Sequence, residues 1–253
     1  MRKKIFFIGA LVASLFMTTP VMAFKWSEMN SASKQSTDKE ILFRDIPWGT
    51  NYTDVDNILG EFNLLKIAGE SFQTKSIDDI IYGDYKGTDF KYNDINIIGS
   101  SLDSNVDVAG YTPEKIQVFL SYVPVNGIIT HADEDSSLYG AQYEFLPINI
   151  DQMESDLKEK LSSLYGEPSE EKNDKDWLNT SMHYTFWYGA NDTELVLKSV
   201  RPSKNDTFTE NEIYISYIWK KGDELLQTAE DILSNNASTN EASVSGNGST
   251  NGL

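Results

Sequence analysis

The chain has 253 residues and no cysteine, which excludes disulfides, thiolate metal sites, haem attachment through cysteine and lipidation of a cysteine. It carries 39 acidic and 21 basic side chains, a formal net charge of −18, and such a surface repels nucleic acid and anionic lipid. A cysteine-free chain of this length has to be stabilised by core burial, and it is long enough for one domain or two small ones.

The first 23 residues have the pattern of a secretory signal peptide. Basic residues 2–4 precede an apolar run from Ile5 to Phe16, and the small residues Val21 and Ala23 stand where a signal peptidase reads. The run is shorter than the ~20 residues that cross a bilayer. We therefore predict a secreted, extracytoplasmic protein that is cleaved after Ala23, with no membrane span after cleavage and no nucleic-acid partner. The lack of cysteine favours a bacterial source.

Residues 24–40 are polar without an apolar period, which predicts a flexible leader, and the Ser/Asn/Gly-rich residues 234–253 predict a disordered tail. The domain between them, 41–233, opens with Phe-Arg-Asp-Ile-Pro-Trp-Gly-Thr at 43–50. Its proline and glycine turn the chain from strand to helix, and Thr50 can cap that helix at 52–60. Trp48 is predicted to be a core anchor between helix and sheet.

This opening resembles that of a group of uncharacterised exported bacterial proteins, in which an Arg-x-Ile-Pro-Trp-Gly motif leads the first mature module. The motif stands here at residues 44–49, and the resemblance covers residues 43–60. The group has no assigned activity, so the resemblance implies export and carries no catalytic residue over to this chain.

Alternating apolar residues and turn signals predict the remaining elements. A helix is predicted at 150–165, where Asn149 caps the start and Gly166 ends the apolar stripe, and a second at 223–233. Residues 126–139 are predicted to be a loop. Strands are predicted at 64–68, 79–82, 95–99, 116–123, 141–146, 182–187, 193–200 and 212–219. The expected class is α+β, an antiparallel β-sheet with helices packed on one face.

Two helix ends look alike, since residues 58–61 and 164–167 both read apolar, apolar, Gly, Glu and both precede a series of strands. The likeness predicts two tandem helix-plus-sheet modules, with halves at 41–125 and 126–233. The rival interpretation is that glycine after a helix is commonplace. The tandem arrangement is similar, as a fold alone, to the β-lactamase inhibitory proteins, and a fold by itself assigns no function.

Catalytic motifs do not stand out. The two histidines, His131 and His183, lack metal-ligand spacing, and the chain contains no nucleophile elbow, phosphate loop or dinucleotide-binding motif. We predict no catalytic residue, no metal ligand and no cofactor.

One weak calcium pattern stays open. Asp103, Asn105, Asp107 and Glu114 have the spacing of oxygen ligands in a calcium loop, but Val108 stands where the turn needs glycine.

The most distinctive residues on the predicted strands are aromatic, and any that face outward would form a patch for a protein or carbohydrate partner. Burial in the core is the alternative. The candidate partner-binding residues are Trp187, Tyr188, Tyr214, Tyr217 and Trp219, with Phe186 beside them. The leading hypothesis is an exported, non-catalytic binding or interaction module. A secreted enzyme inhibitor is the alternative, and an exported hydrolase that uses carboxylates is the third.

Overall fold

The computed structural model describes residues 36–60, 65–66, 76–82, 94–100, 106–130, 132–176, 179–204 and 210–245, with the backbone alone at 65–66, 94–100 and 236–245. All of them belong to one compact unit, Ser33–Leu253. The predicted signal peptide lies outside these ranges. Within them, no helix is both long enough and apolar enough to cross a membrane.

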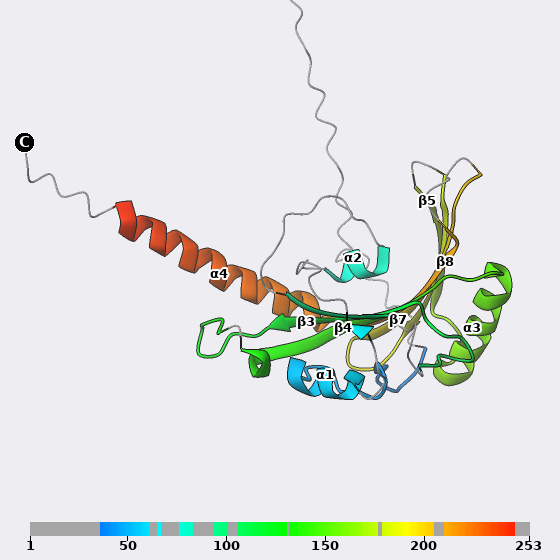
Figure 1. Ribbon diagram of the computed structural model, residues 1–253, viewed down its shortest axis with the longest axis horizontal. Coiled ribbons are helices and arrows are strands. Elements are labelled where there is room, and N and C mark those ends of the chain that lie inside the picture. Colours follow the sequence, from blue (N-terminus) through cyan, green and yellow to red (C-terminus); the bar gives the residue numbers. More distant parts are fainter. Residues whose placement is uncertain are drawn as a thin grey trace, which may run out of the picture. The chain divides into compact units, whose positions relative to one another are not determined.

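The described strands form one antiparallel sheet of eight strands in the order β1-β2-β3-β4-β8-β7-β6-β5 (Figure 1). The α+β class with an antiparallel sheet is thus confirmed. In chain order the strands are β1 Leu65–Lys66, β2 Asp94–Ser100, β3 Lys115–Tyr122, β4 Ser136–Phe145, β5 Glu170–Lys175, β6 Ser181–Tyr188, β7 Thr193–Arg201 and β8 Glu212–Trp219. The α-helices are α1 Tyr52–Gly60, α2 Ile77–Tyr82, α3 Ile150–Tyr165 and α4 Lys221–Ser245, and a 3-10 turn, η2, spans Asp133–Asp135.

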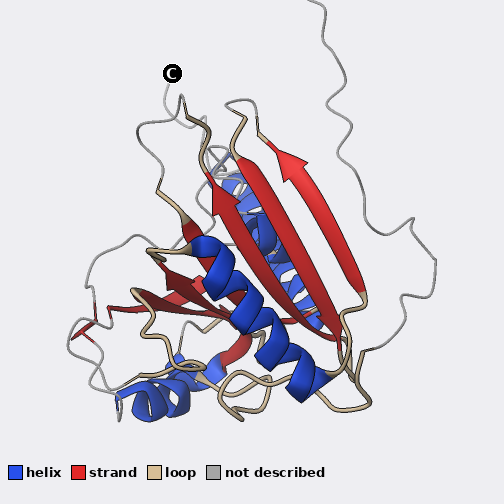
Figure 2. Ribbon diagram, turned by 90° about the vertical axis from the view of Figure 1, so that its right-hand side faces the viewer, coloured by secondary structure: helices blue, strands red, loops and turns tan. Residues whose placement is uncertain are grey.

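The helices cover both faces of the sheet, which corrects the prediction that they pack on one face. Leu59 of α1 and Leu157 of α3 belong to the same buried cluster as Trp187. Ile80 of α2 and Leu226 of α4 join the opposite cluster. Figure 1 shows α2 and α4 on one side of the sheet and α1 on the other, and Figure 2 shows α3 lying along the long strands. The sequence pattern concealed this because the central strands are apolar on both faces and show no clean alternation.

The order of elements repeats along the chain. A helix, α1, precedes the strands β1 to β4, and a second helix, α3, precedes β5 to β8. The two four-stranded series meet where β4 pairs with β8. A tandem arrangement would place its junction between Phe145 and Ile150. The predicted halves divide at 125 and 126 instead, and the duplication itself stays a prediction.

Residues 79–82, predicted to be a strand, are the end of helix α2. Ser76 Oγ accepts from the Asp79 amide at 3.1 Å, and the Asp79 carboxylate accepts from the Ser76 amide at 3.1 Å, a reciprocal pair that starts a helix. Its buried residues Ile77, Ile80 and Ile81 have helical spacing. The strand prediction was wrong because isoleucine is typical of strands, whereas the Ser76 and Asp79 capping pair starts a helix here.

The strand β5 was not predicted, because its sequence EEKNDK has no apolar alternation. It is the edge of the sheet and pairs with β6 alone. Charged side chains on an edge strand oppose pairing with another chain, which is a common use of such a sequence.

The start of the domain is anchored differently from the prediction. Asn51 Oδ1 accepts from the Asp54 amide at the start of α1, whereas Thr50 donates to the Pro47 carbonyl, so Asn51 and not Thr50 caps the helix. Trp48 is half-buried against the core, as an anchor, and its indole donates to the Ile41 carbonyl at 3.0 Å.

Both predicted boundaries of the domain need correction. The leader was expected to be flexible to residue 40, yet the Ser36 amide donates to the Tyr188 carbonyl at 2.9 Å, and Glu40 pairs with Ala190. At the other end α4 continues to Ser245, although a disordered tail was expected from 234. Residues 234–245 contain no glycine or proline, and the next residue is Gly246, so nothing in the sequence stops the helix earlier.

Candidate functional site

The predicted aromatic patch does not form one surface. Trp187, Tyr188 and Tyr217 are buried, and Phe186 beside them is fully buried; Tyr214 and Trp219 are half-buried. Trp187 and Tyr217 also face the α1 and α3 side of the sheet, whereas Tyr188 faces the other side. The residues are neighbours in the sheet, but alternation along each strand sends them to opposite faces.

The aromatic rings on the α2 and α4 side are engaged within the chain. Tyr184, Phe186 and Tyr188 of β6 stack in a row with ring centroids 6.2 Å apart. Lysine ammonium groups lie over these rings, 5.0 Å from Phe186 for Lys172 and 4.7 Å from Tyr188 for Lys220. Such cation–π contacts stabilise the face internally, so this set of rings is part of the core.

A buried carboxylate lies at the end of this row. Glu194 of β7 is 4% exposed, and its Oε2 pairs with Lys220 Nζ at 2.8 Å. Burial raises the pKa of Glu194, and the nearby Lys220 ammonium opposes the rise. The geometry is that of an internal ion pair with an aromatic wall.

A dense polar cluster joins α3 to strands β6 and β7 of the sheet. Glu154 Oε1 accepts from His183 Nδ1 at 2.6 Å and from the Ser199 hydroxyl at 3.0 Å, and Glu154 Oε2 accepts from Arg201. His183 Nε2 lies 3.3 Å from Glu171 Oε2. Both imidazole nitrogens therefore face carboxylates. The Ser199 hydroxyl donates to Glu154 and not to the imidazole, so Ser199 and His183 do not form a pair of nucleophile and general base.

Metal ligation finds no support in the part of the chain that is described. No group of three or more His, Asp or Glu side chains there is arranged to hold a metal ion. In the weak calcium pattern Asp103 and Asn105 lie outside the described residues, as does His131. Asp107 accepts from the Gly110 amide, and the Lys160 ammonium of α3 donates to the Ala109 carbonyl. This turn therefore holds a lysine ammonium from α3.

The strongest candidate for a functional surface is the end of the β3–β4 connection, residues 123–130, which we call the hairpin tip. Val125 and Ile128 pair through two backbone hydrogen bonds of 2.9 and 3.1 Å. Asn126 and Gly127 between them have φ of 52° and 77°, the conformation of a two-residue turn that asparagine and glycine favour. These residues belong to the predicted loop at 126–139, although Asn-Gly between branched residues is a hairpin signal.

The hairpin tip exposes large apolar side chains. Ile128 is 61% exposed and Val125 is 39% exposed, while Ile129 beside them is buried. The pairing of β4 with β8 ends at Gly140, but the pairing of β4 with β3 continues to Ser136, so the tip lies beyond the end of β8. Figure 1 shows this connection projecting from the sheet.

The base of the hairpin tip is well tied to the fold. The Val123 amide donates to the Asp135 carbonyl at 2.8 Å, and Thr130 donates to the Asp135 carboxylate at 2.5 Å. Beside it, the Ser136 hydroxyl accepts from the Tyr52 amide at the start of α1 at 2.8 Å. A rigid turn on a fixed base presents its apolar side chains in one orientation, which lowers the entropy lost on binding.

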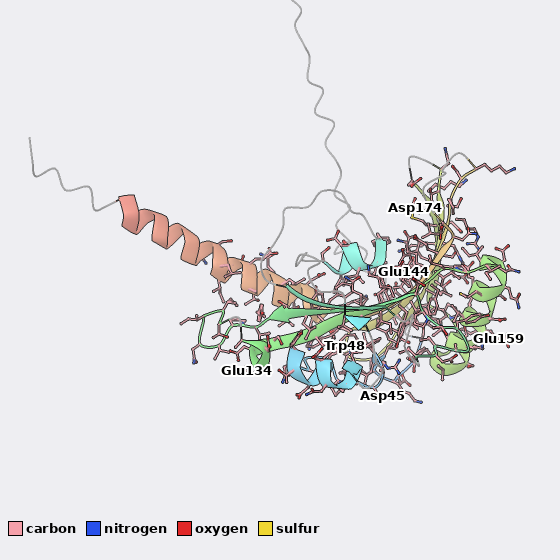
Figure 3. The ribbon with its side chains drawn as sticks, in the orientation of Figure 1. Asp45, Trp48, Glu134, Glu144, Glu159 and Asp174 are labelled. Carbon is pink, nitrogen blue, oxygen red and sulfur yellow. The ribbon has the colours of Figure 1, made fainter. Side chains whose placement is uncertain are left out.

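Acidic residues lie beside the base of the hairpin tip. Asp133 and Glu134 of η2 and Asp54 of the contacting helix α1 are exposed, and Figure 3 shows Glu134 at this end of the sheet. The sequence has no lysine or arginine at 45–65 or at 116–157. We call the hairpin tip with η2 and α1 the acidic end.

These observations describe an apolar, rigid projection in an anionic setting, built from residues that carry no catalytic pattern. Comparison of the chain with protein-family models, with curated proteins and with solved structures found no match.

Proposed function

We propose that this chain is an exported bacterial protein, of the group with the Arg-x-Ile-Pro-Trp-Gly opening, that acts as a non-catalytic interaction module and binds another protein through the hairpin tip. The carrying observation is the pair Val125 and Ile128, exposed on a two-residue turn. Covering an exposed aliphatic side chain with a partner lowers the free energy, by about 1.5–3 kcal/mol for a whole isoleucine side chain.

The choice of a protein over a carbohydrate follows from the side chains at the tip. Val125 and Ile128 are aliphatic and carry no hydrogen-bonding group, so they fit an apolar pocket. Of the aromatic side chains predicted to bind a protein or carbohydrate partner, Trp187, Tyr188 and Tyr217 are buried and do not form an open stacking surface for a sugar.

A site-specific photo-cross-linker tests the proposal. We place it at Ile128 in the full-length chain, expressed in the organism that produces it, and at Leu164 of α3 in a matched control, because Leu164 is 65% exposed. A protein cross-linked from position 128 and not from 164 is expected. Ile128→Asp should then weaken its affinity at least about tenfold, while Leu164→Asp leaves it unchanged. Equal labelling from both positions contradicts the proposal.

Export is tested on the same material. The mature protein should be found outside the cytoplasm with Phe24 as its first residue, as cleavage after Ala23 predicts. Intact residues 1–23 on a cytoplasmic protein would overturn this part of the proposal.

A secreted enzyme inhibitor is the second candidate, because a projecting rigid turn fits a concave cleft better than a flat surface. The captured protein is then a hydrolase, and its activity falls when the chain is added in equimolar amount. Activity that is unchanged by the wild-type chain leaves the interaction module without an inhibitory role.

A further inference from the structure

We infer that the partner of the hairpin tip is a basic protein, with an apolar pocket that is ringed by lysine or arginine side chains. This inference rests on the proposed function and adds the chemistry of the partner. It follows from the charges at the acidic end and from the side chains that project there.

The acidic end carries exposed carboxylates. Asp133 and Glu134 are exposed next to the tip, and no hydrogen bond to either carboxylate is described. Asp54 is exposed on α1, which contacts η2. The absence of lysine and arginine from 45–65 and 116–157 leaves these segments with acidic charges that no cation of their own offsets.

The negative charge of the acidic end restricts the kind of partner that can bind there. An anionic surface slows the approach of nucleic acid, anionic lipid and other acidic proteins, and it accelerates association with cationic surfaces. An apolar tip needs a pocket, and the acidic rim around it needs cations at the edge of that pocket. A neutral apolar pocket would leave the exposed carboxylates desolvated without partners, which costs affinity.

Glu134 and Glu159 provide two exposed carboxylates at opposite ends of the sheet. Figure 3 shows Glu134 at one end of the sheet and Glu159, on α3, at the other. Both glutamates are exposed. The same change of charge at Glu159 therefore alters the net charge equally and leaves the acidic end intact, which separates a local rim contact from a general charge effect.

The experiment measures association kinetics of the full-length chain with the purified protein that is cross-linked from position 128. Glu134→Lys should slow association about threefold, and Glu159→Lys, which changes the net charge by the same amount, should change it less than about 1.5-fold. Raising salt from about 50 to about 500 mM should slow wild-type association at least about threefold. Ile128→Asp should act mainly by faster dissociation.

The outcomes separate the two claims. If no protein is labelled from position 128 above the Leu164 control, the proposed function fails, and this inference fails with it. If a partner is captured and Ile128→Asp weakens its binding, but Glu134→Lys does not slow association, the proposed function stands and the inference of a basic partner is wrong. Equal slowing by Glu159→Lys would also overturn the rim contact.

Discussion

Glu154 of α3 and His183 of β6 meet at 2.6 Å, a hydrogen bond that joins a helix to the sheet beneath it. The carboxylate is only an acceptor, so Nδ1 carries the hydrogen. Glu154 also accepts from Arg201 and Ser199, both of β7. One side chain thus fixes α3 to two neighbouring strands, and its loss leaves several donors without their acceptor.

The first prediction concerns this cluster. Glu154→Gln removes the charge that Arg201 and His183 face, and it should lower the free energy of unfolding by about 1–3 kcal/mol in urea at neutral pH. Glu159→Gln, an exposed change on the same helix, should cost less than about 0.5 kcal/mol. Equal effects of the two variants would show that the cluster does not hold α3.

The same carboxylate gives stability a pH dependence. Burial raises the pKa of Glu154, but hydrogen bonds from His183 and Arg201 and the Arg201 charge together hold it below the ordinary value of 4.5. A depressed carboxylate pKa stabilises the fold at pH above 4.5, and this contribution is lost as the pH falls through the folded value. Between pH 6 and pH 3, the midpoint temperature of thermal unfolding should therefore fall less steeply in Glu154→Gln than in the wild type.

Glu194 should behave in the opposite way. Its pKa is raised by burial more than the Lys220 ammonium lowers it, so its ionised form costs stability at neutral pH and that cost disappears as the pH falls. Glu194→Gln keeps the shape without the charge. The free energy of unfolding at pH 7 should stay the same or rise by up to about 1 kcal/mol. A fall of more than about 1 kcal/mol means that the Lys220 pair is stabilising.

Two glycines test the packing of α4. A Cβ on Gly222, at the start of α4, would lie 2.7 Å from the Tyr139 side chain, whereas a Cβ on Gly60 of α1 meets nothing within 4 Å. Gly222→Ala should destabilise by about 1–3 kcal/mol, because α4 has to shift away from the sheet. Gly60→Ala should be neutral or stabilise by about 0.5–1 kcal/mol. Equal melting temperatures would mean that α4 moves freely on β4.

The turn of the hairpin tip offers a further test. Gly127 has φ of 77°, a conformation that costs other residues about 1–2 kcal/mol, so Gly127→Ala should destabilise by up to that amount. It should also weaken binding at the tip, since Val125 and Ile128 lose their fixed orientation. Asn126→Gly keeps the turn and serves as the control. Unchanged affinity in Gly127→Ala would show that the turn need not be rigid.

The helix at 150–165 was predictable because its signals are local. Its apolar stripe, the Asn149 cap, which accepts from the Gln152 amide, and Gly166 at its end are all within the same stretch of sequence. The strands at 182–187, 193–200 and 212–219 were predictable for the same reason, and β6, β7 and β8 contain them. In α2 a local signal was present as well, since Ser76 and Asp79 have the spacing of a reciprocal capping pair.

The candidate site was not predicted, because exposure is not a local property. Trp187 follows Phe186 and Ile128 precedes Ile129, so both stand beside an apolar residue. Yet Trp187 is fully buried and Ile128 is 61% exposed. What separates them is where α1, α3 and the neighbouring strands lie. The Asn126-Gly127 signal could have predicted the hairpin, but not that it extends past β8.

The amino-acid sequence by itself determined the class of the fold, most of the strands and helix α3, since hydrophobic period, caps and turn residues act over a few neighbouring positions. The tertiary structure alone decided that helices cover both faces, that the aromatic row of β6 belongs to the core, and that Val125 and Ile128 are exposed beyond a base that is tied to the acidic η2 turn. Those features depend on pairing between residues far apart in the chain, β4 with β8 above all, and no local pattern encodes which face a partner element will cover.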